Sequence, residues 1–423
     1  MSIAENITRG FKHKNFRNFF FWQFLSFTGT WLQGTAQSWL VYRLTGSAFF
    51  LGLVGFASSL PALILAPISG VMADRFKRRY VLLVTQILCV IQGILLSALF
   101  FSGHINKWHI LILAVFLGIA NSFDVTARQT FIPLLVTKGD LLNAIALNSS
   151  MFNAARIIGP SIAGLLISKY GEGICFVLNV LSYLPFIIFL FLVKVKEHEV
   201  SEFSSSLAHL KEGISFAWNT SPIRNLLLLL GTYSLCGMSF TTLMPIFSDQ
   251  ILHRGAKGLG ILMGASGIGA VIGALFLASR QKVLGIKKII AFCSILSSVC
   301  IFIFAFSKIY LLSILLLAII GFCSIIIISG SNTAMQAMSP DHLRGRIVGL
   351  FSMMFMGVFP LGSLAVGFLA HLFTAPTAVS IGASVCFLVA IYFSTKVAKL
   401  TKQAKELICT QEKTSVLIEE QIG

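Results

Sequence analysis

The chain has 423 residues, of which 56% are hydrophobic and 11% charged, and its mean hydropathy is +0.89. This composition excludes an ordinary soluble domain and predicts a polytopic membrane protein built of helices. The formal net charge of +17 does not indicate nucleic-acid binding, because the cations fall in the tails and in short segments between apolar runs, where they act as topology signals and contact anionic lipid.

The eight cysteines predict neither disulfides nor a metal site. No C-x-x-C pair occurs, and all of them except Cys409 lie in apolar segments, where cysteine is usually a small core residue. We expect no cofactor. No cleavable signal peptide is expected either, because the first apolar run is too long and leads directly into further spans.

The first predicted span, residues 18–44, follows a basic arm of residues 1–17 and is unusually polar. Its polar side chains recur at three-to-four-residue spacing, which places them on one stripe of a helix, with Trp31 near the middle of the bilayer. The stripe consists of Gln23, Ser26, Thr30, Gln33 and Gln37. In a membrane such a stripe must face protein or water, so hydrogen bonding between helices and the lining of a substrate cavity are both open.

A strongly basic turn joins the predicted spans 47–72 and 80–102. Its four cations cannot lie in hydrocarbon, and the positive-inside rule places them in the cytoplasm. Gly70 permits close approach of two helix ends, and Asp74 can accept from a helix N-terminus or pair with an arginine. A simple topology-determining loop is the alternative. The complete turn reads Gly70-Val-Met-Ala-Asp74-Arg75-Phe76-Lys77-Arg78-Arg79.

The fourth and fifth predicted spans, 108–135 and 141–168, carry charged residues deep in the membrane. Asp124 and Arg156 both lie roughly 20 Å from the cytoplasmic face at 1.5 Å per residue, so they can meet, and Arg128 competes as the i+4 partner of Asp124. Such charges need a partner or water. The pair is either a permanent structural ion pair or a group that titrates during transport. Asn121 and Asn148 are candidate cavity residues.

A glycine-rich stretch in the fifth span indicates a bend and a close helix contact. Pro160, after Gly159, removes a backbone donor, and Gly164 permits another helix to approach closely. The stretch either shapes an interface between the two halves or forms a simple packing kink.

The rest of the chain repeats the pattern of six spans. A sixth span, 173–193, closes a first bundle of residues 18–193, and a polar linker, 194–221, contains an amphipathic segment. Six further spans form a second bundle of residues 222–396, followed by a tail, 397–423. They are expected at 224–249, 257–280, 286–307, 309–337, 346–371 and 375–396.

Charge asymmetry and an internal repeat support this topology. With both tails and the even-numbered loops inside, 24 of the 32 Lys and Arg residues are cytoplasmic and six are outside. Gln129-x-x-x-Pro133 recurs as Gln336-x-x-x-Pro340, at an offset of 207 residues. The chain is therefore predicted to contain two copies of a six-helix unit, twelve spans in all.

With both halves laid out, the chain resembles the major facilitator superfamily over essentially its whole length, and especially its enterobactin exporter and macrolide efflux branch. The turn from Gly70 to Arg79 is similar to the family's cytoplasmic loop signature, although Lys77 stands where a second glycine is usual. Other resemblances lie in Asn15-Phe16-Arg17, Trp39-Leu-Val-Tyr42, Leu44-Thr-Gly-Ser47, Ala127-Arg-Gln129, Leu147-Asn-Ser149, Arg156-Ile-Ile-Gly-Pro160 and Leu343-Arg-Gly-Arg346.

The resemblance implies a non-enzymatic secondary exporter of a bacterial inner membrane, working by alternating access and coupled to protons. It also implies that the stretch from Arg156 to Gly164 is of the antiporter type. In the second half, the polar residues best placed to face a central cavity are Tyr233, Thr242, Asn332 and Gln336. For each one alone, hydrogen bonding within the bundle is the stronger interpretation.

The aromatic and amide content predicts a medium-sized amphipathic or anionic substrate, such as a siderophore or a drug. Lysophospholipid flipping is an alternative, and a non-transporting scaffold or sensor is a weaker one because no large soluble region is present. Channel and enzyme functions are disfavoured, since no filter-like ring, clustered carboxylates or P-loop occurs. The partners expected are a small molecule, protons and lipid, and the chain is expected to be a monomer.

Overall fold

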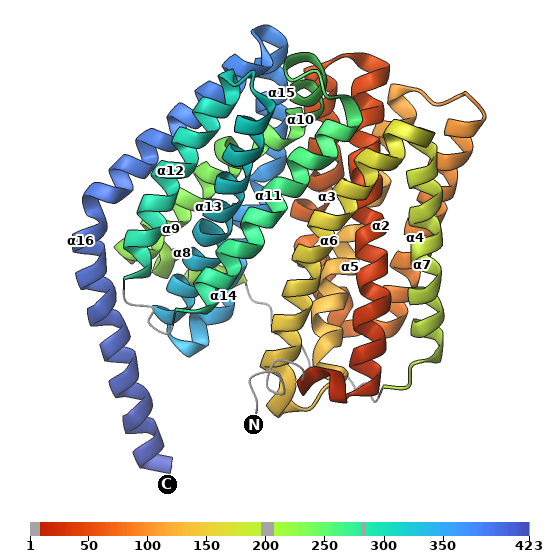
Figure 1. The fold of residues 1–423 in the computed structure, drawn as a ribbon. Coiled ribbons are helices and arrows are strands. Elements are labelled where there is room, and N and C mark those ends of the chain that lie inside the picture. Colours follow the sequence, from red (N-terminus) through yellow and green to blue (C-terminus); the bar gives the residue numbers. More distant parts are fainter. Residues whose placement is uncertain (1–8, 196–206, 281–284, 423) are drawn as a thin grey trace. The chain divides into compact units, whose positions relative to one another are not determined.

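The computed structural model describes residues 9–195, 207–280 and 285–422, and within these ranges every regular element is a helix (Figure 1). The predicted all-helical class is thus confirmed. The first half forms α2 (Lys14–Thr45), α3 (Ala48–Arg75), α4 (Arg78–Phe101), α5 (Lys107–Phe131), α6 (Leu141–Tyr170) and α7 (Gly173–Leu192). One 3-10 turn, η1 (Arg9–Lys12), precedes α2, and two others, η2 (Ile132–Leu134) and η3 (Lys138–Asp140), join α5 to α6.

The turn from α2 to α3 is set by two residues that the sequence places side by side. Gly46 adopts φ +57°, the left-handed conformation that ends a helix and that glycine tolerates best. The Ser47 side chain accepts from the Phe50 backbone N–H and starts α3.

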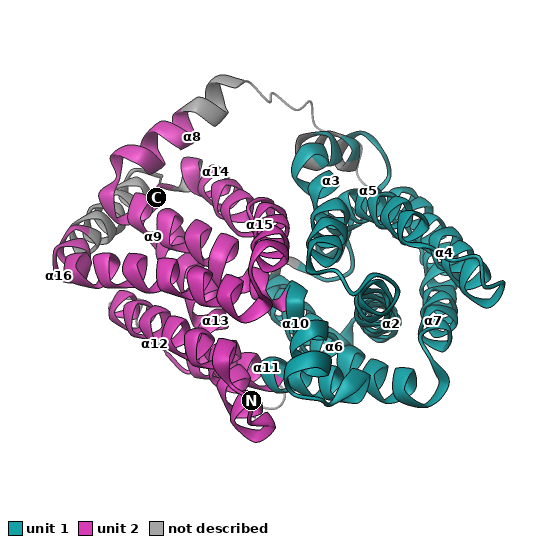
Figure 2. Ribbon diagram, turned by 90° about the horizontal axis from the view of Figure 1, so that it is seen from above, with its two compact units in different colours: residues 1–203, 242–267 teal, residues 204–241, 268–423 magenta. Residues whose placement is uncertain are grey.

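Helix α2 contacts α3, α5, α6, α7 and the short α10 (Met244–Ile246), while α4 packs on both α5 and α7 (Figure 2). Because protein surrounds so much of α2, its polar stripe is covered rather than exposed to lipid. Gln23, Ser26, Gln33 and Gln37 are all buried.

The second half contains α8 (Leu207–Asn219), α9 (Ser221–Thr232), η4 (Tyr233–Met238), η5 (Ser239–Leu243), α10 (Met244–Ile246), η6 (Phe247–Ile251), α11 (Gly255–Ala278), α12 (Ile286–Phe306), α13 (Tyr310–Ala337), α14 (Asp341–Ser352), η7 (Met353–Gly357), α15 (Phe359–Leu372) and α16 (Ala375–Ile422). The predicted spans 224–249 and 346–371 are therefore not continuous α-helices, since π-helical turns interrupt both. Pro360 contributes to the second interruption because it cannot donate to the carbonyl of Met356.

Eleven helical segments among the described residues are long and apolar enough to cross a membrane. Helix α2 has the length but is not among the eleven, because its amides and hydroxyls lower its hydropathy. Its burial among neighbouring helices accounts for this polarity, and the twelve-helix prediction is consistent with the structure.

Contacts divide the chain into two compact units. Unit 1 comprises residues 1–203 and 242–267, and unit 2 comprises residues 204–241 and 268–423 (Figure 2). Unit 1 thus includes the end of the seventh predicted span and the start of the eighth. The predicted division into residues 18–193 and 222–396 stays a prediction.

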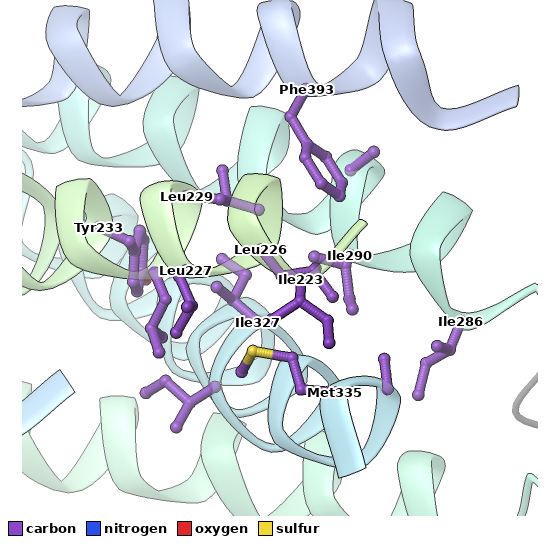
Figure 3. Packing of buried hydrophobic residues seen from close by; sticks show 14 of the residues in the cluster. Ile223, Leu226, Leu227, Leu229, Tyr233, Ile286, Ile290, Ile327, Met335 and Phe393 are labelled. Carbon is purple, nitrogen blue, oxygen red and sulfur yellow. The ribbon is translucent and has the colours of Figure 1, made fainter. Parts of the chain in front are cut away.

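The core of unit 2 is a large apolar cluster in which α9, α12, α13 and α16 meet (Figure 3). Ile223, Leu226 and Leu230 of α9 are fully buried, as are Ile290 of α12 and Ile327 of α13. This packing holds the inward faces of the four helices together.

The predicted linker and the predicted tail both contain helix. Of the predicted linker 194–221, α8 packs on α14 and its Glu212 forms an ion pair with Arg346, whereas 196–206 lie outside the described residues. The predicted tail continues α16 as far as Ile422, and its side chains after Gln403 also lie outside the described part.

Candidate functional site

Asp124 lies at the centre of a buried polar site in unit 1. Its Oδ2 accepts from Arg128 Nε at 2.7 Å, and its Oδ1 accepts from Thr85 Oγ1 at 2.9 Å and from Gln86 Nε2 at 2.8 Å. Asp124 is 4% exposed and Arg128 5%. Helices α4 and α5 therefore position three donors on one carboxylate, the arrangement that a buried negative charge requires.

The Arg128 guanidinium lies against two aromatic rings. Its Cζ lies 4.7 Å from the ring centroids of both Phe27 and Phe186, a geometry in which ring quadrupoles stabilise a cation. Among the described residues, its buried Nη1 has no hydrogen-bond partner. Of the two predicted partners for Asp124, the structure therefore places Arg128 against it. Arg156 lies half-buried on α6.

A second polar cluster joins α2, α4 and α7. Gln33 Nε2 donates to Gln92 Oε1 at 2.8 Å, and Asn179 Nδ2 donates to Gln33 Oε1 at 2.8 Å. Asn179 also donates to Tyr183 OH at 3.3 Å, and this hydroxyl lies 3.1 Å from Thr30 Oγ1. The amide of Gln33 thus links α2 to both α4 and α7.

Sequence reasoning missed Gln92, Asn179 and Tyr183. The available signal was the presence of amides within two apolar spans, Gln86 and Gln92 in one and Asn179 in the other, since a polar group in a membrane helix needs a partner. It could not identify that partner.

The remaining predicted cavity residues of the first half have varied surroundings. Gln23 Nε2 donates to Asn148 Oδ1 at 3.2 Å, Gln37 is buried, and Asn121 and Trp31 are half-buried. The lining of a cavity by these residues stays a prediction.

The predicted cavity residues of the second half fall in both units. Tyr233 is buried in unit 2, with its OH 3.0 Å from Ser297 Oγ and 2.6 Å from Ser324 Oγ. Gln336 Nε2 donates to Asn332 Oδ1 at 3.0 Å, and both side chains are half-buried. Thr242, in unit 1, is half-buried.

The basic turn joins α3 to α4 and anchors α7. Arg79 donates through Nε to the Leu190 carbonyl at 2.5 Å and through Nη2 to the Phe191 carbonyl at 2.6 Å. A cation at the C-terminal carbonyls of a helix satisfies acceptors that the helix leaves open. Arg75 is exposed and Arg78 half-buried, whereas the side chain of Asp74 and the surroundings of Gly70 lie outside the described part.

The glycines of α6 lie at two close helix contacts. A Cβ at Gly159 would lie 2.6 Å from Trp31 Cβ on α2, and one at Gly164 would lie 2.8 Å from Gly260 Cα on α11. Pro160 lies inside the same helix. Both contacts fall within unit 1, and neither leaves room for a larger residue.

Two polar contacts secure the C-terminal end of α2. Tyr42 OH donates to Asp249 Oδ2 at 2.7 Å, which joins α2 to η6. Arg43 binds Glu172 through Nε at 2.7 Å and through Nη2 at 3.2 Å. Sequence analysis did not single out Asp249, because it lies at the very end of a predicted span and its partner is 207 residues away.

At the opposite end of α2, the N-terminal segment is attached to the α5–α6 connection. His13 Nε2 lies 2.8 Å from Asp140 Oδ2, and the Gly10 N–H donates to Asn143 Oδ1 at 2.8 Å. The hydrogen bond from His13 is the main cause that lowers the pKa of Asp140 below its ordinary value, and Thr137 and the nearby Arg9 add to it.

The described residues contain no group of three or more His, Cys, Asp or Glu side chains placed to hold a metal ion. The structure thus has apolar helices that can cross a membrane, and these helices surround buried polar clusters, one of which contains an ion pair. Such features are typical of a polytopic membrane transporter.

Comparison with known proteins identifies the kind of transporter. A family model of the major facilitator superfamily, described as transmembrane secretion effector, matches residues 8–422, and the chain belongs to this family. It is a multi-pass secondary transporter and not an enzyme.

Three relatives share its sequence over most of their length. The staphyloferrin A transporter of Staphylococcus aureus is 28% identical over 90% of this chain and 96% of its own. The multidrug efflux pump Tap of Mycolicibacterium fortuitum is 28% identical over 79% and 84%. The enterobactin exporter EntS of Citrobacter koseri is 26% identical over 87% and 88%. The predicted resemblance to the siderophore and drug exporter branch is thereby confirmed.

A solved structure supports the fold. The nucleoside transporter NupG superposes with a TM-score of 0.67 at 16% identity, covering 90% of this chain and 98% of that one. At this identity the likeness concerns the fold alone.

Proposed function

We propose that the protein exports a medium-sized amphipathic or anionic organic molecule, siderophore-like or drug-like, across a bacterial inner membrane in exchange for protons. The names of its relatives, which include siderophore and multidrug transporters, support this class of substrate. The excess of cations in the even-numbered loops and the tails supports cytoplasmic termini. The transporter works as a monomer by alternating access.

The observation that carries proton coupling is the buried Asp124–Arg128 pair. As a carboxylate, Asp124 accepts hydrogen bonds from three donors. Protonation neutralises the carboxylate and weakens its attraction for Arg128, which the Phe27 and Phe186 rings continue to hold. The pair thus has two charge states that can favour two conformations of α4 and α5.

One proton is energetically sufficient. A proton that crosses the membrane down a potential of about 100 mV releases about 2.3 kcal/mol, and each tenfold concentration ratio of substrate costs about 1.4 kcal/mol. At that potential one proton therefore supports a substrate gradient of about fortyfold. No nucleotide hydrolysis is needed.

Two groups of residues are proposed to control the conformational change. Tyr42 and Asp249, together with the close α6–α11 contact at Gly164, hold the end of unit 1 expected to face outward. The turn at the other end, with Gly70, Asp74, Arg75, Arg78 and Arg79, acts as the cytoplasmic gating loop. Both groups must change their contacts if access alternates.

The test uses sealed inside-out vesicles with an imposed pH gradient and a panel of siderophores, lipophilic drugs and a lysophospholipid. The wild type is compared with Asp124→Asn, and with Asp140→Asn as a matched loss of an acid outside the site. We expect gradient-driven accumulation by the wild type and by Asp140→Asn, whereas Asp124→Asn retains exchange but loses accumulation.

Each other outcome corrects a different part of the proposal. Normal accumulation by Asp124→Asn would show that the coupling residue lies elsewhere. Movement of the lysophospholipid alone would favour a flippase, and no gradient-dependent movement of any compound would contradict the exporter proposal.

A further inference from the structure

The two intramembrane arginines of unit 1 differ in how far they are buried. Arg128 forms an ion pair with Asp124, and its guanidinium lies against the rings of Phe27 and Phe186. With 5% of its surface exposed, Arg128 has little area left for a ligand. Arg156 lies on a different helix, α6, and is half-buried, so more of its surface is accessible.

Arg156 lies in the middle of the 30-residue helix α6. It is 15 residues after Leu141, which corresponds to about 22 Å along the helix axis. An ionised arginine that faced hydrocarbon at this depth would cost about 2.5 to 3.5 kcal/mol or more. The surface of α6 around Arg156 must therefore face water or a polar group rather than lipid.

Aromatic side chains gather one helical turn before Arg156. Phe152 is 38% exposed. Its ring lies 5.2 Å from that of Phe27 and 6.0 Å from that of Trp31, both in edge-to-face contact. Gly159 permits this cluster, because any Cβ there would collide with Trp31 and force α2 away from α6.

Polar side chains border the cluster along the same helix. Asn153 is half-buried and its Nδ2 donates to the Ser149 carbonyl at 2.9 Å, while Ser149 is exposed. Asn148, one turn before Phe152, accepts from Gln23. The exposed ring of Phe152 thus lies one helical turn from the cation of Arg156 and close to amide side chains, on a helix that is long and apolar enough to cross the membrane.

We propose that Arg156, Phe152, Phe27 and Trp31 form a binding surface on unit 1 for an anionic aromatic group, a carboxylate or sulfonate carried on an aryl ring. A guanidinium binds such anions through two parallel hydrogen bonds, and the aromatic cluster provides edge or face contacts to the attached ring. This inference rests on the proposed export function, of which it specifies the substrate class and the residue that recognises the charge.

The test is equilibrium binding to the purified full-length chain in lipid nanodiscs. The probe is 2-naphthoate, compared with 2-naphthamide, which lacks the charge, and decahydro-2-naphthoate, which lacks the aromatic ring. The variants are Arg156→Gln, Arg156→Lys and Phe152→Leu, and Lys169→Gln removes a cation elsewhere on α6 as a matched control. Monodispersity by gel filtration verifies folding.

We expect the wild type to prefer 2-naphthoate over both analogues. Arg156→Gln should weaken 2-naphthoate about tenfold to hundredfold, the value of a charge-assisted hydrogen bond, and leave 2-naphthamide nearly unchanged. Arg156→Lys should recover part of the loss. Phe152→Leu should weaken both aromatic probes by a similar factor of about two to ten, and Lys169→Gln should bind as the wild type does.

Three results would overturn the assignment: no preference for 2-naphthoate in the wild type, the same preference in Arg156→Gln, or an equal loss in Lys169→Gln. Transport assays in sealed vesicles distinguish failure of the proposed binding surface from failure of the proposed export function. If the wild type exports panel compounds but the preference does not depend on Arg156, the binding surface is wrong and the exporter stands. If binding behaves as expected and nothing is exported, the surface stands and the exporter proposal is wrong.

Discussion

Replacing Asp124 with alanine tests whether the polar site of unit 1 is held by charge. The substitution leaves Arg128 buried, with its charge unpaired, and removes the acceptor shared by Thr85 and Gln86. Breaking a buried ion pair from one side typically costs about 3 to 5 kcal/mol. For a unit of this size, each kcal/mol lowers the melting temperature by about 2 to 4 °C, so we expect a decrease of about 6 to 20 °C.

The assay is thermal unfolding of the purified protein in detergent, followed by tryptophan fluorescence and by the monodisperse fraction after heating. Two variants calibrate the result. Thr85→Val removes one of the three donors and should cost less than Asp124→Ala. The double variant Asp124→Leu with Arg128→Met replaces the pair with apolar side chains, and should be more stable than Asp124→Ala because no unpaired charge remains.

The reasoning fails if the double variant is no more stable than Asp124→Ala, because the loss would then come from packing and not from the unpaired cation. It also fails if Asp124→Ala melts within 2 °C of the wild type. In that case Arg128 must have another partner or access to water, and the charge-state proposal for Asp124 loses its structural basis.

Three further predictions concern the ends and the crossings of α2 and α6. A hydrogen bond from His13 lowers the pKa of Asp140, so this carboxylate stabilises the N-terminal attachment above about pH 4, the ordinary pKa of aspartate, and the contribution disappears as the pH falls through the lower folded-state pKa. The protection of residues 9–12 from hydrogen exchange, relative to the intrinsic rate at each pH, should therefore fall in acid in the wild type and should be low at every pH in Asp140→Asn. Tyr42→Phe removes the hydrogen bond to Asp249, so a cysteine that replaces the neighbouring buried Ser248 should be labelled faster by a thiol reagent in a Tyr42→Phe background. Unchanged labelling would mean that the bond does not hold this end closed. Gly164→Val places a side chain where even a Cβ would lie 2.8 Å from the α11 backbone, so folded protein recovered from membranes should fall severalfold, and recovery at the wild-type level would show that α6 and α11 separate easily.

Sequence and structure agree where a local property decides the outcome. The Gly46 and Ser47 pair ends one helix and starts the next because of the conformational freedom of glycine and the hydroxyl of serine. The π-helical turns that interrupt two spans were not predicted, because such turns depend on contacts with neighbouring helices. In η4, for example, Ser234 Oγ donates to the carbonyl of Phe355 in η7. The spacing of residues along one span does not contain that information.

The sequence by itself determined the class of protein, the number of spans and the need for partners. Which segments cross the membrane, and in which direction, depends on the free energy of transfer of whole segments between water and lipid. This free energy adds up along the chain, so composition and charge asymmetry reveal it. By the same logic, the sequence required that Asp124 have a partner at membrane depth. It could not choose between Arg128 and Arg156, because both lie at a suitable depth.

Only the tertiary structure decided which partners meet. The pairing of Arg128 with Asp124 also depends on Phe27 and Phe186 from other helices, and the link from Gln33 to Asn179 joins residues 146 positions apart. Hydrogen bonds and cation–π contacts act over a few ångströms, so they depend on how helices rotate and cross. Depth along a helix is set by residue number, but the neighbour that a side chain finds at that depth is set by packing.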